Sequence, residues 1–303
     1  MSGTMDLTGS GLRYFLEVAH IGSIGQASER LHVAASAISR QIAKLEHDIG
    51  VPLFERRPRG MVLSEAGEIL AAYARRHQLE SEQALTDIRS LGALRHSTIR
   101  LASSEGFARD FLPETIVAFR EKYPGVQFQL HVTSPGGATQ QVRDGTADLA
   151  VTYSLAPEKD IRVEFSAAQP IYALMPDGHP LADREEIWLA DLLPYPLAVM
   201  EQGTTIRQVF DICVSLEGLA FEPAFVSNYS GALESFVRMR GGVTLVGYLT
   251  IRRRLGTDGM KAVPIRNPEL SRRSVQIQSM ARRALPAAVS AFLAHLVTHT
   301  EGP

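Results

Sequence analysis

Small and polar residues lie beside basic ones between Ala34 and Arg59, a combination that suits contact with nucleic acid. The first group comprises Ala34, Ala35, Ser36, Ser39, Arg40 and Lys44. Small side chains let a helix enter the major groove, and Ser, Arg and Lys can hydrogen-bond to base edges or phosphates. Arg56, Arg57 and Arg59 follow in a basic turn. By themselves they would be typical of a solvated loop, but beside the first group they favour phosphate contact.

A second set of polar residues follows the apolar runs that we expect to form strands. In open α/β layers ligands bind at the carboxyl ends of strands, and two facing layers form a cleft. The candidates for ligand binding are Ser103, Ser104, Ser134, Tyr153, Thr204, Thr205, Arg207, Asn228 and Tyr248. Capping of a following helix is the alternative role for the hydroxyls. Arg207 would suit a carboxylate ligand, whereas Glu105 would oppose an anion, so the charge of the ligand stays open.

The sequence offers no pattern for catalysis or metal binding. Its nine histidines show no HExxH spacing, and it lacks a glycine-rich phosphate loop and a GxSxG motif. We therefore predict that the protein is not an enzyme and holds no metal or cofactor. The one cysteine, Cys213, lies in an apolar helical pattern that favours a small core residue, with an oxidation sensor as the alternative. The clusters Arg252–Arg254 and Arg272–Arg273 are typical of solvated surface.

Composition limits the class of protein. The chain has 303 residues, 45% of them hydrophobic, and 31 basic against 33 acidic residues give a net charge of -2. This length predicts two or three domains. Residues 1–67 carry seven basic and seven acidic side chains, and five of the basic ones lie between Arg40 and Arg59. Contact with nucleic acid must therefore depend on local charge. A single cysteine, no secretory signal and no membrane-length apolar run predict a cytoplasmic protein without a membrane partner.

Helical periodicity predicts three short helices at the N-terminal end. Leu12, Phe15 and Leu16 mark the first, Ser23 caps a second that runs to Leu31, and a third ends before Gly50. Residues 53–57 and 61–63 have the pattern of two short strands, and the turn composition of residues 58–60 between them predicts a hairpin. Two short helices at a tight turn followed by a hairpin are typical of a winged helix-turn-helix.

A long helix should follow from Ser64 to about Ala93, since the stretch is rich in Ala, Glu, Arg, Gln and Leu. With little hydrophobic core of its own, such a helix either connects domains or pairs with a partner. Residues 92–97 then predict a hinge.

From residue 98 onward, short apolar runs alternate with helical patterns, which predicts parallel βαβ units. We expect strands at 99–102, 126–132, 149–152, 171–175, 197–200, 223–226, 243–247 and 275–279. We expect helices at 112–123, 137–145, 205–217, 231–240 and 285–297. The last strand and helix should return to the first part of this region.

The run LRYFLEVAHIGSIGQASERLHVAASAISRQIAKLEHDIGVPLFERRPRGMVLSEAG resembles the N-terminal winged helix-turn-helix of LysR-type transcriptional regulators. The later motifs LPETIVAFREKYPGV, VRDGTADLAV and MPDGHPLA resemble the co-inducer-binding region of the same family. The sequence departs from the family pattern at Ser28, where alanine is usual, and at Ala35, where glutamine is frequent. Because glutamine can read adenine and alanine can contact only a thymine methyl group, a different operator preference is expected.

The resemblance implies an α/β protein in three parts. Residues 1–67 would form the winged helix-turn-helix, with the helix-turn-helix at about 24–43, and residues 68–96 the linker helix and hinge. Residues 97–303 would form a two-lobed, periplasmic-binding-protein-like effector domain. Its first lobe would comprise 97–169 with 271–303, and its second lobe 170–270.

The resemblance also implies a function. The protein would bind double-stranded promoter or operator DNA under the control of a small-molecule effector, form a dimer or tetramer, act in the cytoplasm at the nucleoid and contact RNA polymerase. A solute-binding or transport component and an enzyme on the two-lobed fold are the alternatives. The missing signal peptide and residues 1–67 argue against the first, and the missing catalytic cluster argues against the second.

Overall fold

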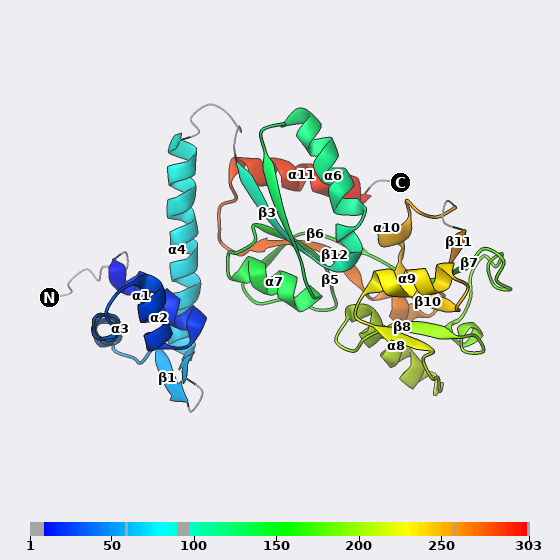
Figure 1. Ribbon diagram of the computed structural model, residues 1–303, viewed down its shortest axis with the longest axis horizontal. Coiled ribbons are helices and arrows are strands. Elements are labelled where there is room, and N and C mark those ends of the chain that lie inside the picture. Colours follow the sequence, from blue (N-terminus) through cyan, green and yellow to red (C-terminus); the bar gives the residue numbers. More distant parts are fainter. Residues whose placement is uncertain (1–8, 58–59, 90–96, 257–258, 302–303) are drawn as a thin grey trace. The chain divides into compact units, whose positions relative to one another are not determined.

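The computed structural model describes residues 9–57, 60–89, 97–256 and 259–301. The chain divides into two compact units, Met1–Arg89 and Ser90–Pro303, whose elements are drawn in Figure 1. Within these ranges, no helix combines the length and apolar character needed to cross a membrane.

The N-terminal unit packs three helices around one small core. They are α1 (Ser10–Ile21), α2 (Ile24–Leu31) and α3 (Ala35–Ile49). Phe15, Val18, Ala27 and Ile38 are completely buried in this core. The Ser23 hydroxyl accepts a hydrogen bond of 3.4 Å from the Gln26 amide and so caps α2. The predicted helix-turn-helix is therefore confirmed.

A hairpin of β1 (Phe54–Arg57) and β2 (Gly60–Leu63) follows α3. The strands are antiparallel, with Phe54 opposite Leu63. The Glu46 carboxylate, on α3, accepts hydrogen bonds of 2.8 Å from the Leu53 amide and 3.3 Å from the Phe54 amide. This contact fixes the start of the hairpin to the helix before it. The predicted turn at Pro58 and Arg59 lies outside the described residues.

Helix α4 (Glu65–Arg89) is 25 residues long. The Ser64 hydroxyl accepts a hydrogen bond of 3.0 Å from the Gly67 amide, which confirms Ser64 as its cap. A Cβ atom at Gly67 would lie 2.0 Å from the Leu53 carbonyl oxygen, so only glycine allows this close approach. Leu70, Ala71 and Ala74 complete the core of the N-terminal unit. Packing thus extends beyond the predicted limit at residue 67. The predicted helix end near Ala93 and residues 92–96 of the predicted hinge lie outside the described residues.

The first lobe of the C-terminal unit contains a five-stranded sheet in the order β4-β3-β5-β12-β6. Its strands are β3 (Thr98–Ser103), β4 (Gln127–Val132), β5 (Leu149–Ser154), β6 (Ile161–Ala168) and β12 (Ser274–Met280). Helices α6 (Phe111–Lys122) and α11 (Ala287–Glu301) cover one face and α7 (Pro135–Arg143) the other, as Figure 1 shows. The short α5 (Glu105–Ala108) precedes α6. Phe107 and Phe292 are completely buried in the core between α6, α11 and the sheet.

The second lobe has a sheet in the order β11-β7-β10-β8-β9. Its elements are β7 (Ile171–Pro176), η1 (Leu189–Leu192), β8 (Leu197–Met200), α8 (Thr205–Leu216), β9 (Phe225–Ser227), α9 (Ser230–Arg238), β10 (Val243–Gly247), α10 (Tyr248–Ile251), β11 (Met260–Pro264) and η2 (Pro268–Ser271). The chain passes from the first lobe to the second after β6 and returns before β12. The predicted α/β class with two lobes is confirmed.

The prediction of parallel pairing is correct only for three neighbouring strands on one side of each sheet. Strand β3 is parallel to β4 and β5, and β8 is parallel to β9 and β10. Strand β12 runs antiparallel to β5 and β6, and β7 runs antiparallel to β10 and β11. These antiparallel strands include the ones that carry the chain from one lobe to the other and back.

Candidate functional site

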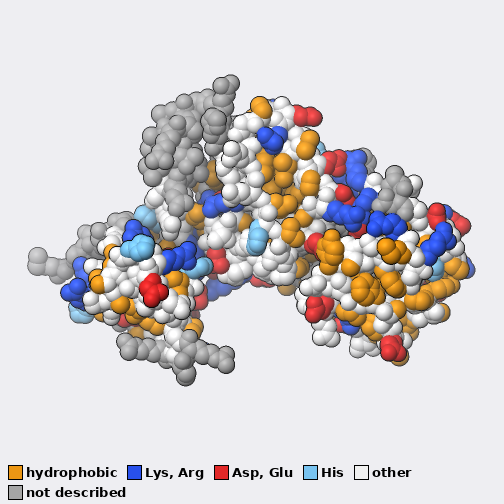
Figure 2. Space-filling model, viewed as in Figure 1, with side chains coloured by type: hydrophobic (Ala, Val, Ile, Leu, Met, Phe, Trp, Pro, Cys, Tyr) orange, Lys and Arg blue, Asp and Glu red, His pale blue; other side chains and the backbone are white. Residues whose placement is uncertain are grey.

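The residues that we predicted to contact DNA lie on the exposed side of α3. Ala34, Ala35, Ser36, Ser39, Arg40 and Lys44 are all exposed, while Ile38, Ile42 and Leu45 face the core. No carboxylate of the described residues forms an ion pair with Arg40 or Lys44. Figure 2 shows several Lys, Arg and His side chains on the visible face of this unit. The start of α3 therefore presents hydrogen-bond donors and positive charge to solvent.

The hairpin arginines are described only in part. Arg57 is exposed and its Nη2 lies 2.9 Å from the Glu55 carboxylate, which offsets part of its charge. Arg56 lies in β1, whereas Arg59 falls outside the described residues. The predicted set at the hairpin tip thus remains a prediction from the sequence.

A pocket of about 800 Å³ opens between the two lobes of the C-terminal unit. We call it the interlobe pocket. Six of the predicted ligand-binding residues line it, namely Ser104, Ser134, Tyr153, Thr204, Thr205 and Asn228. Both lobes contribute to this set. The strand-end rule therefore located the pocket from the sequence.

Three predicted residues do not line the interlobe pocket. Ser103 is completely buried and its hydroxyl donates a 2.9 Å hydrogen bond to the Ser104 carbonyl oxygen. The Arg207 guanidinium bonds to Asp211 at 2.7 Å and lies over the Phe221 ring. Tyr248 packs against Tyr172, with ring centroids 5.2 Å apart. These three side chains thus lie outside the pocket lining, and each contacts a neighbouring residue.

Two of the hydroxyls in the pocket also cap helices. The Ser134 hydroxyl accepts a 3.2 Å hydrogen bond from the Gly137 amide at the start of α7. The Thr204 hydroxyl accepts one of 3.4 Å from the Arg207 amide at the start of α8. The capping alternative therefore holds for both residues, although they also line the pocket.

Arg273 also lines the interlobe pocket. The sequence pattern wrongly predicted that this residue is solvated surface. Its side chain lies on the pocket wall just before β12 and is only 3% exposed. Its guanidinium carbon lies 3.7 Å from the centroid of the Tyr153 ring. Burial lowers the pKa of the guanidinium, and the charge of Tyr153 opposes this shift. Burial likewise raises the pKa of the Tyr153 hydroxyl. The position of Arg273 follows from the chain topology, because the segment that returns the chain to the first lobe borders the pocket.

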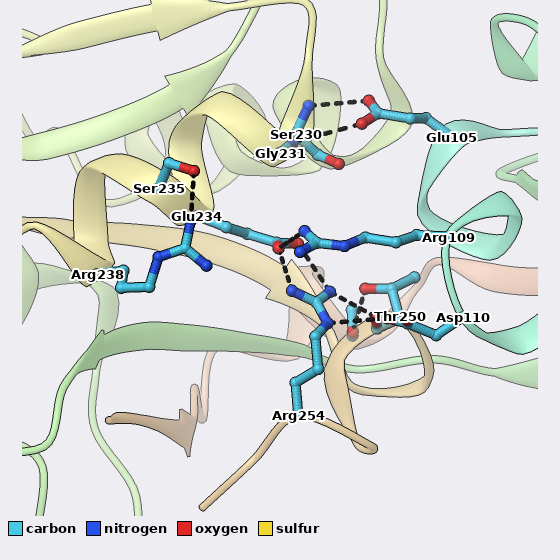
Figure 3. A network of polar contacts seen from close by, with 11 residues as sticks. Glu105, Arg109, Asp110, Ser230, Gly231, Glu234, Ser235, Arg238, Thr250 and Arg254 are labelled. Carbon is cyan, nitrogen blue, oxygen red and sulfur yellow. Dashed lines mark hydrogen bonds and ion pairs between the residues drawn. The ribbon is translucent and has the colours of Figure 1, made fainter. Parts of the chain in front are cut away.

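Glu105 crosses the interlobe pocket and caps a helix of the opposite lobe. Its carboxylate accepts hydrogen bonds of 2.8 Å from the Ser230 amide and 3.3 Å from the Gly231 amide, at the start of α9. Figure 3 shows both contacts. A carboxylate at a helix N-terminus satisfies free amides and the positive end of the helix dipole. The negative charge of Glu105 is therefore already compensated within the protein.

A second contact between the lobes is a network of charged side chains around Glu234, also drawn in Figure 3. The Glu234 carboxylate is 2.7 Å from Arg109 Nη1 and also binds the Arg254 guanidinium. Arg254 Nε lies 2.8 Å from Asp110. Burial alone would lower the pKa of Arg254, but the hydrogen bonds and charges of Glu234 and Asp110 raise it. The assignment of Arg254 to solvated surface was thus wrong.

Cys213 has the environment of a core residue. It is completely buried in the second-lobe core, and burial raises the pKa of its thiol to about 11. The prediction of a small core residue is confirmed. Within the part of the chain that the structure describes, no three His, Cys, Asp or Glu side chains form a group that could hold a metal ion.

Two family models match the chain. The model for the bacterial regulatory helix-turn-helix protein of the lysR family covers residues 10–68, and the LysR substrate binding domain covers residues 92–301. GltC of Bacillus subtilis, a transcriptional dual regulator, is 31% identical over 91% of this chain and 92% of its own. The RuBisCO operon transcriptional regulator of Allochromatium vinosum is 29% identical over 91% of both chains.

Solved structures agree on the fold. A full-length OxyR variant from Pseudomonas aeruginosa superposes with a TM-score of 0.68 at 22% identity and covers 97% of this chain and 95% of its own. Full-length CbnR in complex with its target DNA gives a TM-score of 0.56 at 19% identity, over 97% of this chain and 100% of its own. With the helix-turn-helix and the two-lobed domain in place, the chain belongs to the LysR family and is a transcriptional regulator with an effector-binding domain, not an enzyme.

Proposed function

We propose that the protein reads operator DNA with the start of α3 and contacts the backbone with its hairpin. Ala34, Ala35, Ser36 and Ser39 would approach base edges, and Arg40 and Lys44 would meet bases or phosphates. Arg56, Arg57 and Arg59 would lie over the backbone. The observation that carries the proposal is the exposed, polar and basic outer face of α3, opposite a face buried in the core.

Arg40→Ala tests the contact with DNA. We expect the variant to fold normally, because Arg40 is exposed and the core of the unit is untouched. Loss of one base or phosphate contact should weaken operator binding by about 1–3 kcal/mol. The measurement is a titration of the full chain, at fixed salt, with an operator recovered by selection from random DNA.

Arg120→Ala is the matched control, since it removes one exposed positive charge from α6 in the C-terminal unit. Its affinity should equal that of the wild type. Equal affinities of the Arg40 and Arg120 variants would exclude a contact role for Arg40.

We also propose that a small-molecule effector occupies the interlobe pocket and changes how the protein holds DNA. The pocket is large enough for a metabolite, and polar groups from both lobes line it. A ligand that touches both lobes binds their closed arrangement more tightly than an open one. Such a preference gives a coupling free energy of about 1–3 kcal/mol between effector and DNA.

A dimer, or a tetramer of two dimers, is the assembly that we propose. Helix α4 supports it, because Ile69 and Tyr73 are exposed on the part of this long helix that does not face the core. Two copies would match the two halves of an inverted repeat. We further propose that the assembly works in the cytoplasm at the nucleoid and that RNA polymerase is its partner at promoters.

A further inference from the structure

The interlobe pocket contains a buried positive charge that has no ion-pair partner among the described residues. Arg273 is 3% exposed, and its Nε and Nη2 atoms are buried without a hydrogen-bond partner among the described residues. The buried hydroxyl of Tyr153 also lacks a partner within the same ranges. These three groups belong to two side chains that are stacked on one another and that both line the pocket.

The unpaired atoms converge beside Gly247. A Cβ atom at this glycine would lie 2.5 Å from Arg273 Nη2 and 2.6 Å from the Tyr153 hydroxyl oxygen. A side chain at position 247 would therefore collide with both donors. The Nε and Nη2 atoms form one edge of the guanidinium and direct two parallel N–H bonds the same way. Together with the Tyr153 hydroxyl, they make a set of three donors.

Such a set suits an acceptor with negative charge. A buried charge without a partner is strongly unfavourable, and arginine does not escape the penalty by losing its proton. Stacking on Tyr153 offsets only part of it. The parallel N–H groups match the two coplanar oxygens of a carboxylate, which arginine binds in a bidentate manner.

The acidic residues of the pocket do not satisfy Arg273. Glu105 accepts from the Ser230 and Gly231 amides, and Glu234 is paired with Arg109 and Arg254. Glu201, the remaining acidic residue of the lining, is exposed to solvent. The uncompensated buried charge of the pocket is thus the positive charge of Arg273.

We propose that Arg273, with Tyr153 beside it, anchors the carboxylate of the effector. This proposal rests on the proposed function of the interlobe pocket and specifies its ligand as an organic acid. The Arg273 edge would take the two carboxylate oxygens, and the Tyr153 hydroxyl would donate to one of them. The rest of the ligand would face the hydroxyls of Ser104, Ser134 and Thr205 and the apolar side chains of Met200 and Ile206.

Acetate serves as the probe, because it carries the proposed carboxylate and little else. The full chain is heated in sodium acetate or sodium chloride at equal ionic strength and pH 7.5. Unfolding is followed by the fluorescence of Trp188, the single tryptophan, which lies in the C-terminal unit. At acetate concentrations near ten times the dissociation constant, we expect the wild-type midpoint to rise by about 2–4 °C relative to chloride.

Arg273→Met should lose this rise and should be at least as stable as the wild type in chloride, because methionine removes an unpaired buried charge. Arg207→Met is the matched control. It removes an arginine that already has Asp211 as partner, so it should lower the midpoint in both salts and keep the rise in acetate. Arg273→Lys, which keeps the charge without the fork, should keep only part of the rise.

An equal midpoint of the wild type in both salts, or an undiminished rise in Arg273→Met, would overturn the assignment. DNA titration of the same variants separates this failure from failure of the proposed function. Without acetate, the wild-type chain should bind the selected operator, and this result does not depend on the outcome of the acetate experiment. If the wild-type chain binds no operator, the proposed function fails whatever the acetate result.

Discussion

At the scale of single residues, Glu234 holds two arginines from different parts of the C-terminal unit. It is 5% exposed and bonds to Arg109 and Arg254. Glu234→Gln would leave both guanidiniums without this negative charge. Because breaking a buried pair leaves an uncompensated charge, we expect a loss of unfolding free energy of about 3 kcal/mol or more. Urea unfolding followed by Trp188 fluorescence measures it.

Glu114→Gln is the control for Glu234. Glu114 pairs with Arg253 on the surface, and such exposed pairs contribute less than about 1 kcal/mol. If the two variants lose similar amounts of unfolding free energy, the buried Glu234 network stabilises the fold no more than an exposed ion pair does.

Cys213 gives a prediction about reactivity and pH. With a thiol pKa of about 11, roughly one thiol in a thousand is ionised at pH 8, so a thiol reagent should react only after unfolding. The pKa is higher in the folded than in the unfolded chain. Between about pH 9 and pH 11 the unfolded state therefore binds fewer protons, and stability should fall as pH rises.

Titration with a chromogenic disulfide at pH 8, with and without urea, tests the thiol. Rapid labelling of the native protein would show that Cys213 is accessible and would restore the sensor alternative. Urea midpoints measured across the same alkaline range test the direction of the pH effect.

At the scale of elements, α9 begins with amides that a residue of α5 satisfies across the interlobe pocket. The stability of the first turn of α9 thus depends on contact between the two lobes. Glu105→Ala should leave the first turn of α9 uncapped, at a free energy of about 1 kcal/mol. We expect the Ser230 and Gly231 amides to exchange with deuterium about five- to tenfold faster, as read by mass spectrometry of a peptide covering 229–235.

The amides of α8, which the Thr204 hydroxyl caps within its own lobe, serve as the internal control and should not change. Unchanged exchange at Ser230 and Gly231 in the Glu105 variant would contradict the proposed role of Glu105. It would mean that the first turn of α9 is as stable without this cap as with it.

The elements that sequence predicts well are those whose signals are local. Caps at Ser23, Ser64 and Thr204 begin α2, α4 and α8 where the pattern indicated, and β8 and β10 have the predicted bounds. Strands β6 and β11 are not predicted. Strand β6 is an edge strand with most residues partly or fully exposed, so it shows no continuous apolar run. Strand β11 is another short edge strand.

The site residues also divide into those with local sequence signals and those whose roles depend on the three-dimensional structure. Ser104, Thr205 and Asn228 line the pocket because strand ends meet there, a rule that needs no knowledge of side-chain partners. The roles of Arg254 and Arg273 depend instead on partners that are distant in sequence or on burial by another element. An arginine beside a second arginine has the same local pattern whether it is solvated or buried, so Arg273 could be identified only in three dimensions.

At the scale of the whole molecule, the chain separates reading DNA from sensing a ligand into two compact units. Within the C-terminal unit, the two passages between the lobes tie them into one body with a pocket between them. Arg273 lies on the second passage, next to β12, which pairs with β5 and β6 of the first lobe. A ligand held by Arg273, as proposed, would therefore bind directly beside a segment that connects the two lobes.

The exposed cations on α3 belong to the segment 1–67, in which seven basic and seven acidic residues cancel. Non-specific affinity for DNA grows with the number of phosphates that a protein neutralises. A DNA-binding segment without net charge and with a few exposed cations is retained only briefly at incorrect sites. Genomic DNA should consequently sequester few copies of this regulator, so that occupancy of its operator responds to small changes in the number of molecules per cell.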